Sequence, residues 1–505
     1  MTTTNRVLIN TFAQYLRTVF NVLLALYSTR IVIETLGVSD YGLYSLIAGV
    51  VAMLSFVTNA LVISTQRYLS YYHGQNDKKY VSKVFCNSFL IHGVLSLILL
   101  VVLISLQGFI VNNVLNIPTN REHAACVVYL IIAIIVSMTL VTSPFRALYV
   151  ARENIVYISV VDIIDGILKV VAAVCLTLFL YDNLILYAIF LLLISFFDFF
   201  AFSIYSWKNY EECVYPKNER IDKKLLKQIL GFASWTLYSN GCVVMRTQGV
   251  AIVINKFFGV IFNASFGIAQ QINGALSSVS QAIANALSPQ IIKAEGNDNR
   301  DRMLKLAGLE SKYASIMLGM VAIPIIFELP FIFKIWLGSI PKSAEVFTRF
   351  IIIACLCDQM TAGLGIANQA IGKIRSYSLL FGTVKILTVP FSIIALQIIQ
   401  NLSVVMFCYL IVELFSSLLR LFFLKRTANL AICKFVKKYM CPALITMLID
   451  VVLCTLIQHT TSWEYRIIIM YPITIIAMSM VVYMSMQKNE RVLVNNILLK
   501  LKKKI

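Results

Sequence analysis

The chain has 505 residues, of which 59% are hydrophobic and only 13% charged, and its mean hydropathy is +0.82. This composition excludes a water-soluble globular protein and predicts a membrane protein. Lys and Arg number 43 against 24 Asp and Glu, and in a membrane protein such an excess is expected in cytoplasmic loops rather than at a nucleic-acid site. The eleven Cys residues show no Cys-x-x-Cys spacing, which argues against a disulfide framework or a zinc site.

Runs of roughly 20 mainly apolar residues, the length that crosses a membrane as a helix, recur along the chain. The first run is too long for a signal-peptide core, so we expect it to be retained as a span. Fourteen spanning helices are predicted, and together they make an all-α polytopic membrane protein without a soluble domain. Their approximate ranges are Val7–Ile33, Gly42–Ser64, Val84–Leu106, Ala124–Leu148, Ile155–Leu180, Leu184–Tyr205, Ile229–Phe258, Ser265–Leu287, Leu306–Phe327, Val346–Gln369, Tyr377–Ile399, Val404–Leu424, Phe435–Leu456 and Ile467–Met486.

The distribution of positive charge predicts the orientation of these spans. An even number of spans places both termini on one side, and the connections on that side carry 31 Lys and Arg residues against five on the other. Because positive residues concentrate in cytoplasmic loops, both termini are expected in the cytoplasm. The longest external connections, around 112–123 and 331–345, have at most about sixteen residues, which leaves no room for an external domain.

Short segments recur along the chain at a separation of 222 residues. Leu36-Gly37-Val38 returns as Phe258-Gly259-Val260, and Gly74 in the first cytoplasmic loop returns as Gly296. Six spans fit this separation, so the two copies are expected to have the same orientation in the membrane. The predicted organisation is an N-terminal six-helix lobe over 1–215, a C-terminal six-helix lobe over 216–430, an extra transmembrane helix pair over 431–486, and a basic cytoplasmic tail over 487–505.

Two arginines lie near the middle of predicted spans, where a charge costs on the order of 3 kcal/mol and normally faces water or a partner. Arg17 is in the first span, and Arg246 is in the seventh with Ser239 two turns before it on the same face. Helical spacing adds a polar stripe to the face of Arg17. The members of that stripe are Asn10, Gln14, Asn21 and Ser28.

The intramembrane acids allow two interpretations. Asp162, Asp165 and Lys169 share one helical face, and they form either a self-neutralising structural network or a site where protonation or cation binding is coupled to movement. The same choice applies to Asp198 and Lys385. The sequence leaves both interpretations open.

No catalytic motif rises above background. The sequence contains no G-x-x-x-x-G-K-[ST] run for nucleotide binding, and none of its four His residues begins a His-Glu-x-x-His motif. We therefore expect a protein that is not an enzyme and that carries no metal or other cofactor.

Two motifs flank the predicted second span: Leu36-Gly37-Val38-Ser39-Asp40-Tyr41-Gly42 before it and Ser64-Thr65-Gln66-Arg67-Tyr68 at its end. Together with the span pattern and the polar first helix, they resemble the polysaccharide-export branch of the multidrug/oligosaccharidyl-lipid/polysaccharide transporter superfamily. Within this branch, the chain is most similar to the Wzx-type O-antigen and capsule flippases. The resemblance covers essentially the whole chain.

The resemblance implies a MATE-like fold in the bacterial cytoplasmic (inner) membrane. It also implies a flippase that moves undecaprenyl-pyrophosphate-linked oligosaccharide repeat units to the outer leaflet by alternating access, for the synthesis of lipopolysaccharide O-antigen, capsule or exopolysaccharide. A proton or sodium gradient is the implied energy source. A polysaccharide polymerase and a chain-length regulator are the implied protein partners, together with the lipid-linked substrate and membrane lipids, and no nucleic acid is involved.

The family is associated with cationic residues that line a central cavity, and this sequence offers three sets of candidate residues. For the pyrophosphate they are Arg17, Arg30, Arg67 and Arg246, although Arg30 is also spaced to pair with Glu34. For the sugars and the cavity lining they are Asn10, Gln14, Asn21, Trp235, Tyr238 and Ser239. For ion coupling, or a structural network, they are Asp162, Asp165, Lys169, Asp198 and Lys385.

Two other functions compete with this one. A cation-coupled multidrug antiporter of the same fold would use Asp162, Asp165 or Asp198, but the central charge of the first span is positive. A membrane glycan polymerase or ligase would also be polytopic and basic. Such enzymes usually need a sizeable external loop, which this chain lacks.

Overall fold

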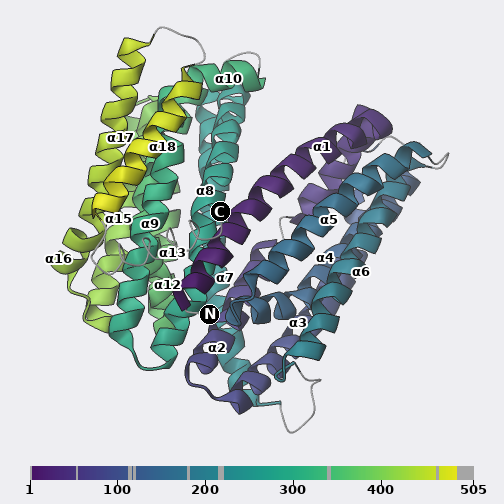
Figure 1. Ribbon diagram of the computed structural model, residues 1–505. Coiled ribbons are helices and arrows are strands. Elements are labelled where there is room, and N and C mark those ends of the chain that lie inside the picture. The colour runs from purple at the N-terminus through teal and green to yellow at the C-terminus, as the bar shows by residue number, and fades with distance from the viewer. Residues whose placement is uncertain are drawn as a thin grey trace, which may run out of the picture. The chain divides into compact units, whose positions relative to one another are not determined.

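The computed structural model describes residues 3–52, 55–111, 117, 121–178, 182–213, 221–337, 343–461 and 466–485 (Figure 1). These residues form helices and short connections, and no strand occurs among them. The predicted all-α fold class is confirmed.

Eight helices among the described residues are long and apolar enough to cross a membrane. A ninth is added if α11 (Ala344–Gln359) and α12 (Ala362–Ile371), which are bent by 45°, form one broken span. The chain is therefore a multi-pass membrane protein. Each predicted span overlaps a described helix, whereas the number fourteen and the cytoplasmic placement of both termini stay predictions.

The chain divides into two compact units. Unit 1 is Met1–Gly241 with Asn285–Met303 and Gln369–Leu379, and unit 2 is Cys242–Ala284 with Leu304–Asn368 and Leu380–Ile505. Both α7 (Lys223–Phe258) and α8 (Val260–Gly296) contribute a part to each unit. The lobe boundaries at 215 and 430, the helix pair over 431–486 and the tail stay predictions, and the tail over 487–505 lies outside the described residues.

The other helices of unit 1 are consecutive in the chain. Among them α4 is the central helix, because it packs against α1, α2, α3 and α6. Half of the residues in the apolar stretch of α4 are buried, against 22% of those in the corresponding stretches of α3 and α6. Small buried residues such as Ala125, Ala133 and Ser137 allow the neighbouring helices to approach α4 closely. Their bounds are α1 (Thr3–Ala52), α2 (Ser55–Gly74), α3 (Lys78–Phe109), α4 (Glu122–Ala151), α5 (Ile155–Cys175), the short 3-10 helix η3 (Leu176–Leu178) and α6 (Asn183–Asn209).

Unit 2 is arranged around α15, which packs against α11 and α14, while α17 packs against α18. Glu413 and Arg420 are seven residues apart on α15, which places them on one face of that helix. The remaining helices are α9 (Arg300–Phe327), α10 (Leu329–Leu337), α13 (Ile374–Ile386), α14 (Thr388–Ile398), α15 (Leu402–Ala428), α16 (Ile432–Phe435), the π-helical turn η5 (Val436–Met440), α17 (Cys441–Thr460) and α18 (Ile467–Ser485). The first residues of α9 and α13 and the last of α12 belong to unit 1.

The backbone repeats its unusual conformations at the separation found in the sequence. Gly37 kinks α1 with a φ of 79°, and Gly259 separates α7 from α8 with a φ of 92°. Asn76 and Asp298 are both left-handed, with φ values of 56° and 55°. Each is followed by a residue that caps the next helix: Asp77 accepts from the Tyr80 amide at 3.0 Å, and Asn299 accepts from the Arg302 amide at 3.1 Å. The predicted repeat is therefore visible in local geometry.

The ends of α2 and α8 meet within unit 1 at two glycines. A Cβ atom on Gly74 would collide with the backbone of Lys293, and one on Gly296 would collide with the backbone of Tyr71. About two turns before these glycines, the Gln66 amide donates to the Ser288 hydroxyl at 3.2 Å, and these two residues are also 222 apart. The contact is reciprocal: Gly74 lies against Lys293 and Gly296 lies against Tyr71, and Tyr71 and Lys293 are themselves 222 residues apart.

Candidate functional site

A network of charged side chains lies inside unit 1. Arg17 on α1 donates to Asp162 of α5 at 2.7 Å and to the Gln14 side chain at 2.6 Å. Arg146 on α4 forms an ion pair with the other oxygen of Asp162 and lies over the Phe202 ring, 4.8 Å from its centroid. Asp162 therefore joins two guanidinium groups from two different helices.

The rest of this network is on α5 and α6. Lys169 pairs with Asp165 one turn before it on α5, at 2.7 Å. Asp198 on α6 interacts electrostatically with Arg146 and Asp165, but its buried Oδ1 has no hydrogen-bond partner among the described residues. One carboxylate of the network is thus left with unused hydrogen-bonding capacity.

Exposure separates the cations of the unit 1 network from its paired acids. The side chains of Arg17, Arg146 and Lys169 are 21%, 34% and 45% exposed, whereas those of Asp162 and Asp165 are 15% and 18% exposed. The basic side chains are therefore more accessible than the carboxylates that pair with them. An anion that approaches this surface meets guanidinium and ammonium groups first.

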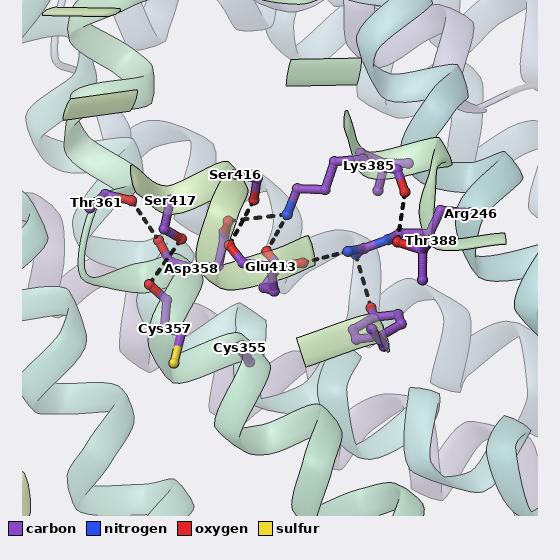
Figure 2. A network of polar contacts seen from close by, with 12 residues as sticks. Arg246, Cys355, Cys357, Asp358, Thr361, Lys385, Thr388, Glu413, Ser416 and Ser417 are labelled. Carbon is purple, nitrogen blue, oxygen red and sulfur yellow. Dashed lines mark hydrogen bonds and ion pairs between the residues drawn. The ribbon is translucent and has the colours of Figure 1, made fainter. Parts of the chain in front are cut away.

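Unit 2 contains a second network, shown in Figure 2, which begins at Arg246 on α7. Arg246 forms an ion pair with Glu413 and donates to the Tyr409 hydroxyl at 2.9 Å, with its guanidinium 4.2 Å from the centre of that ring. Glu413 also pairs with Lys385 of α13. The side chains of Arg246, Glu413 and Lys385 are only 4–7% exposed, so this part of the network is closed to solvent, whereas the Asp358 side chain that continues it is 32% exposed.

Asp358 on α11 connects this network to a second arginine. Lys385 lies 3.4 Å from its carboxylate (Figure 2). Arg420 lies 3.0 Å from the same carboxylate and also donates to the Asp358 carbonyl at 3.0 Å. A cavity of about 290 Å³ opens beside Asp358 within unit 2, and Glu310 of α9 lines it. Glu310 is fully buried, and neither of its carboxylate oxygens accepts a hydrogen bond from the described residues. Polar residues of the lining are Ser277, Ser280, Gln281 and Gln359.

The two other arginines that the sequence proposed for the pyrophosphate are elsewhere. Arg30 pairs with Glu34 at 3.0 Å on an exposed face, as its spacing predicted. Arg67 is buried, donates to the carbonyls of Gln369 and Ala370 at 2.9 and 3.1 Å, and lies over aromatic rings. Neither belongs to the two networks, and a substrate role for either stays a prediction.

The residues predicted to contact sugars are divided in the same way. Gln14 belongs to the unit 1 network, whereas the buried Asn10 donates to the Glu153 carbonyl at 2.8 Å. The Oδ1 atom of Asn21 is buried without a partner among the described residues. Trp235 contacts the half-exposed Tyr238 and lies beneath the guanidinium of Arg375, and Ser239 is buried.

Sequence reasoning did not single out Arg146, Arg420 and Glu310. Both arginines lie near the ends of predicted spans and were assigned to the connections. For Arg420, the spacing of seven residues from Glu413 is a signal that the two side chains share one face of a helix. Glu310 carried no comparable signal. The described residues contain no group of His, Cys, Asp and Glu arranged to hold a metal ion.

A third charged cluster lies outside the spans, where Glu212 follows α6. Arg152 donates to both of its carboxylate oxygens at 2.5 Å, and His73 lies 3.2 Å away. Burial acts against the charged form of Glu212, but the hydrogen bonds from His73 and Arg152 outweigh it and lower its pKa to about 2. This carboxylate is therefore ionised at any physiological pH.

No family model and no curated protein matches the sequence. Solved structures do match the fold. A crystal structure of a MATE mutant has a TM-score of 0.73 at 14% identity, covering 86% of this chain and 98% of its own. An outward-facing multidrug-resistance MATE family transporter of the MOP superfamily has a TM-score of 0.68 at 14% identity, covering 84% and 96%.

A third similar structure is a MOP superfamily transporter from Pyrococcus furiosus, with a TM-score of 0.69 at 14% identity, covering 86% of this chain and 97% of that one. That protein is described as having a binding pocket of reverse polarity, which suggests a different function for it. At these identities the likeness concerns the fold. The chain has a MATE-like fold, as the resemblance in its sequence implied.

Proposed function

We propose that this protein is a flippase that carries undecaprenyl-pyrophosphate-linked oligosaccharide repeat units across the bacterial cytoplasmic membrane for surface polysaccharide synthesis. The observation that carries the proposal is the exposure pattern of the unit 1 network. Arg17, Arg146 and Lys169 present positive charge toward solvent, while their partner acids lie deeper. The fold is one that membrane transporters use.

The chemistry of the substrate fits such a surface. A pyrophosphate carries two negative charges and a ring of acceptor oxygens, and the forked guanidinium of arginine matches phosphate oxygens with two parallel hydrogen bonds. Arg17 donates one hydrogen bond to Asp162 and one to Gln14, so a pyrophosphate would compete with a carboxylate and a carboxamide for the same donors. Such an exchange compensates the charge of Arg17 both with and without substrate.

We further propose that the cycle is coupled to a proton or sodium gradient, and that a polysaccharide polymerase and chain-length regulator use the flipped product. The unpaired Oδ1 of Asp198 and the unpaired carboxylate of Glu310 support ion coupling, because a buried carboxylate without a partner favours a proton or a cation. The protein itself would do no covalent chemistry.

A cation-coupled multidrug antiporter is the second candidate. It is favoured by the multidrug-resistance transporter among the similar structures and by Asp198, which offers a carboxylate oxygen that no described residue binds. The two functions make opposite demands on unit 1. A cationic drug needs its acids, whereas a pyrophosphate needs its arginines.

The deciding experiment measures lipid-linked saccharides in cells depleted of the protein. Complete single repeat units that resist a membrane-impermeant sugar oxidant in spheroplasts, and so lie in the cytoplasmic leaflet, are the expected result. Complete units in the outer leaflet would indicate a polymerase or ligase instead. An unchanged lipid pool, together with raised sensitivity to cationic drugs, would favour the antiporter.

Complementation of the depleted cells then tests the residues. Arg17→Ala and Arg246→Ala are expected to lose flipping, while Arg17→Lys keeps part of it because a point charge remains without the fork. Lys305→Ala is the matched control, since it removes an exposed cation at the start of α9. Full activity of Arg17→Ala at normal membrane levels would overturn the cationic-surface proposal. Arg246 is enclosed in unit 2, so the loss expected for Arg246→Ala comes through a lower amount of protein in the membrane.

A further inference from the structure

The C-terminal half of α7 exposes polar side chains that form no hydrogen bond with any described residue. Gln248 and Asn255 are both exposed, and they are seven residues apart, so they lie on one face of the helix. Neither side chain forms a hydrogen bond with the described residues. An unpaired carboxamide is costly in lipid, so this face of α7 must meet water.

A shallow concavity occupies this face, within unit 2. It has a volume of about 350 Å³ and is formed by α7 and the first turn of α8 after the Gly259 bend. Four of its lining residues are polar or charged, and none of these four side chains has a hydrogen-bond or ion-pair partner among the described residues. The lining residues are Gln248, Ala251, Ile252, Asn255, Lys256 and Asn263.

The side chains of this lining suit a sugar ring. Each carboxamide offers both a donor and an acceptor, which is the combination that pairs with neighbouring hydroxyl groups. Ile252 lies between Gln248 and Asn255 with 67% of its surface exposed, and provides an apolar patch for the C–H face of a ring. Lys256 adds the only charge of the lining.

We propose that this concavity is a saccharide subsite for an acidic sugar, in which Gln248, Asn255 and Asn263 bind hydroxyl groups and Lys256 binds a carboxylate. The inference rests on the proposed flippase function and deepens it, because it assigns a negative charge to the glycan in addition to that of the pyrophosphate. The positive-inside count predicts that this end of α7 faces outward. The subsite would therefore hold the glycan on the side where it is released.

The dimensions and the charge separate this ligand from a drug. Ligand pockets span about 300–1,000 Å³, and a volume of about 350 Å³ lies at the lower end, where a single sugar unit fits. No carboxylate lines the concavity, so a cationic drug would meet Lys256 without any compensating acid. The lining therefore favours a small anionic polyol.

The experiment measures direct binding of two small probes to the full chain in nanodiscs, by saturation-transfer difference NMR. The probes are methyl β-D-glucuronide and methyl β-D-glucoside, which differ at one carboxylate. Wild-type protein is expected to bind the glucuronide more tightly. The double variant Asn255→Ala/Asn263→Ala is expected to weaken both probes roughly fivefold or more, the effect of losing one or more hydrogen bonds, and Lys256→Gln should remove the preference.

Two further variants protect the interpretation. Ala251→Trp fills the concavity without removing a polar group and is expected to abolish binding, while Gln228→Ala removes an exposed carboxamide from the other end of α7 and should change nothing. All four variants alter exposed or partly exposed side chains, and unchanged thermal unfolding of each verifies its fold.

The possible failures are distinguishable. Equal binding by wild type, the double variant and Ala251→Trp would overturn the subsite, because the sugar would then sit elsewhere, and the flippase proposal would stand. Absence of binding by wild-type protein would overturn the subsite as well. The depletion experiment on lipid-linked saccharides decides the flippase proposal independently of either result.

Discussion

The networks of the two units are built from the same inventory but differ in access to solvent. In unit 1, Arg17, Arg146 and Lys169 face the three acids of α5 and α6; in unit 2, Arg246, Lys385 and Arg420 face Asp358, Glu413 and Glu310. The arginine and lysine groups of the first are 21–45% exposed, whereas Arg246 and Lys385 are 7% and 4% exposed. The same set of charges is therefore accessible in unit 1 and largely enclosed in unit 2, and the proposed function assigns anion binding to the first and cohesion to the second.

The difference follows from where the bridging acid lies. Asp162 joins two arginines whose side chains are 21% and 34% exposed, and the proposed function requires that an incoming anion can replace it there. Glu413 joins Arg246 and Lys385 in the interior. Without Glu413, these two buried cations would lose the carboxylate that neutralises both of them. Removing a bridging acid should thus be far more damaging in unit 2 than in unit 1.

The largest effect is expected for Glu413→Ala. The substitution leaves two buried cations without their shared acid and should lower the free energy of unfolding by about 3–5 kcal/mol. Thermal unfolding in nanodiscs and the amount of protein in the membrane measure it. Glu345→Ala is the control, because it removes an acid from a partly exposed pair with Arg349 on α11; equal losses for both would refute the cohesive role.

Asp162→Ala is expected to have an intermediate effect on stability, roughly 1 kcal/mol, because solvent screens the two arginines that it releases. Flipping activity in complementation should fall clearly even though the free energy of unfolding changes little, because Asp162 would no longer hold Arg17 and Arg146 in place. Unfolding curves and complementation are compared on the same variant. A stability loss as large as that of Glu413→Ala would remove the distinction between the units.

The variants Arg17→Lys and Arg246→Lys compare the two networks by their effects on flipping and on the amount of protein in the membrane. Arg17→Lys is expected to keep part of the flipping, because an exposed ammonium still attracts phosphate. Arg246→Lys should reduce membrane levels instead, because a lysine loses the fork that reaches both Glu413 and Tyr409. The same pattern of loss in both variants would show that the two networks share one role.

The smallest effect is expected for Arg30→Ala. Its ion pair with Glu34 is exposed, and such i,i+4 pairs contribute about 0.3–0.5 kcal/mol. Unfolding should therefore be nearly unchanged. A clear loss of flipping by this variant at unchanged stability would move Arg30 from the helix surface into the substrate path.

Periodicity in the sequence was sufficient to predict the helices and the repeat. Apolar runs locate spans because the backbone in lipid can form hydrogen bonds only within its own helix. The residue pairs Gly37/Gly259 and Asn76/Asp298, each 222 residues apart, both have positive φ values. The i,i+4 spacings of Arg30 with Glu34 and of Asp165 with Lys169 also predicted their pairs. All of these are local properties of one helix.

Contacts between helices were beyond the sequence. Nothing in the spacing indicates that Arg17 and Arg146 share Asp162, or that Arg67 binds the carbonyls of Gln369 and Ala370 some 300 residues away. The exposure of each network depends on how helices from distant parts of the chain pack. The sequence therefore identifies the charged residues but not how exposed each of them is in the folded protein.

The reciprocal contact of α2 with α8 constrains how the two copies can diverge. Gln66 and Ser288 occupy equivalent positions of the two copies and contact each other. If the copies were identical, this contact would join two residues of the same type, two amides or two hydroxyls. This chain instead sets the amide of Gln66 against the hydroxyl of Ser288, a donor with an acceptor. Fusion of the copies into one polypeptide makes such unlike pairing available, and an assembly of two separate identical subunits would have no access to it.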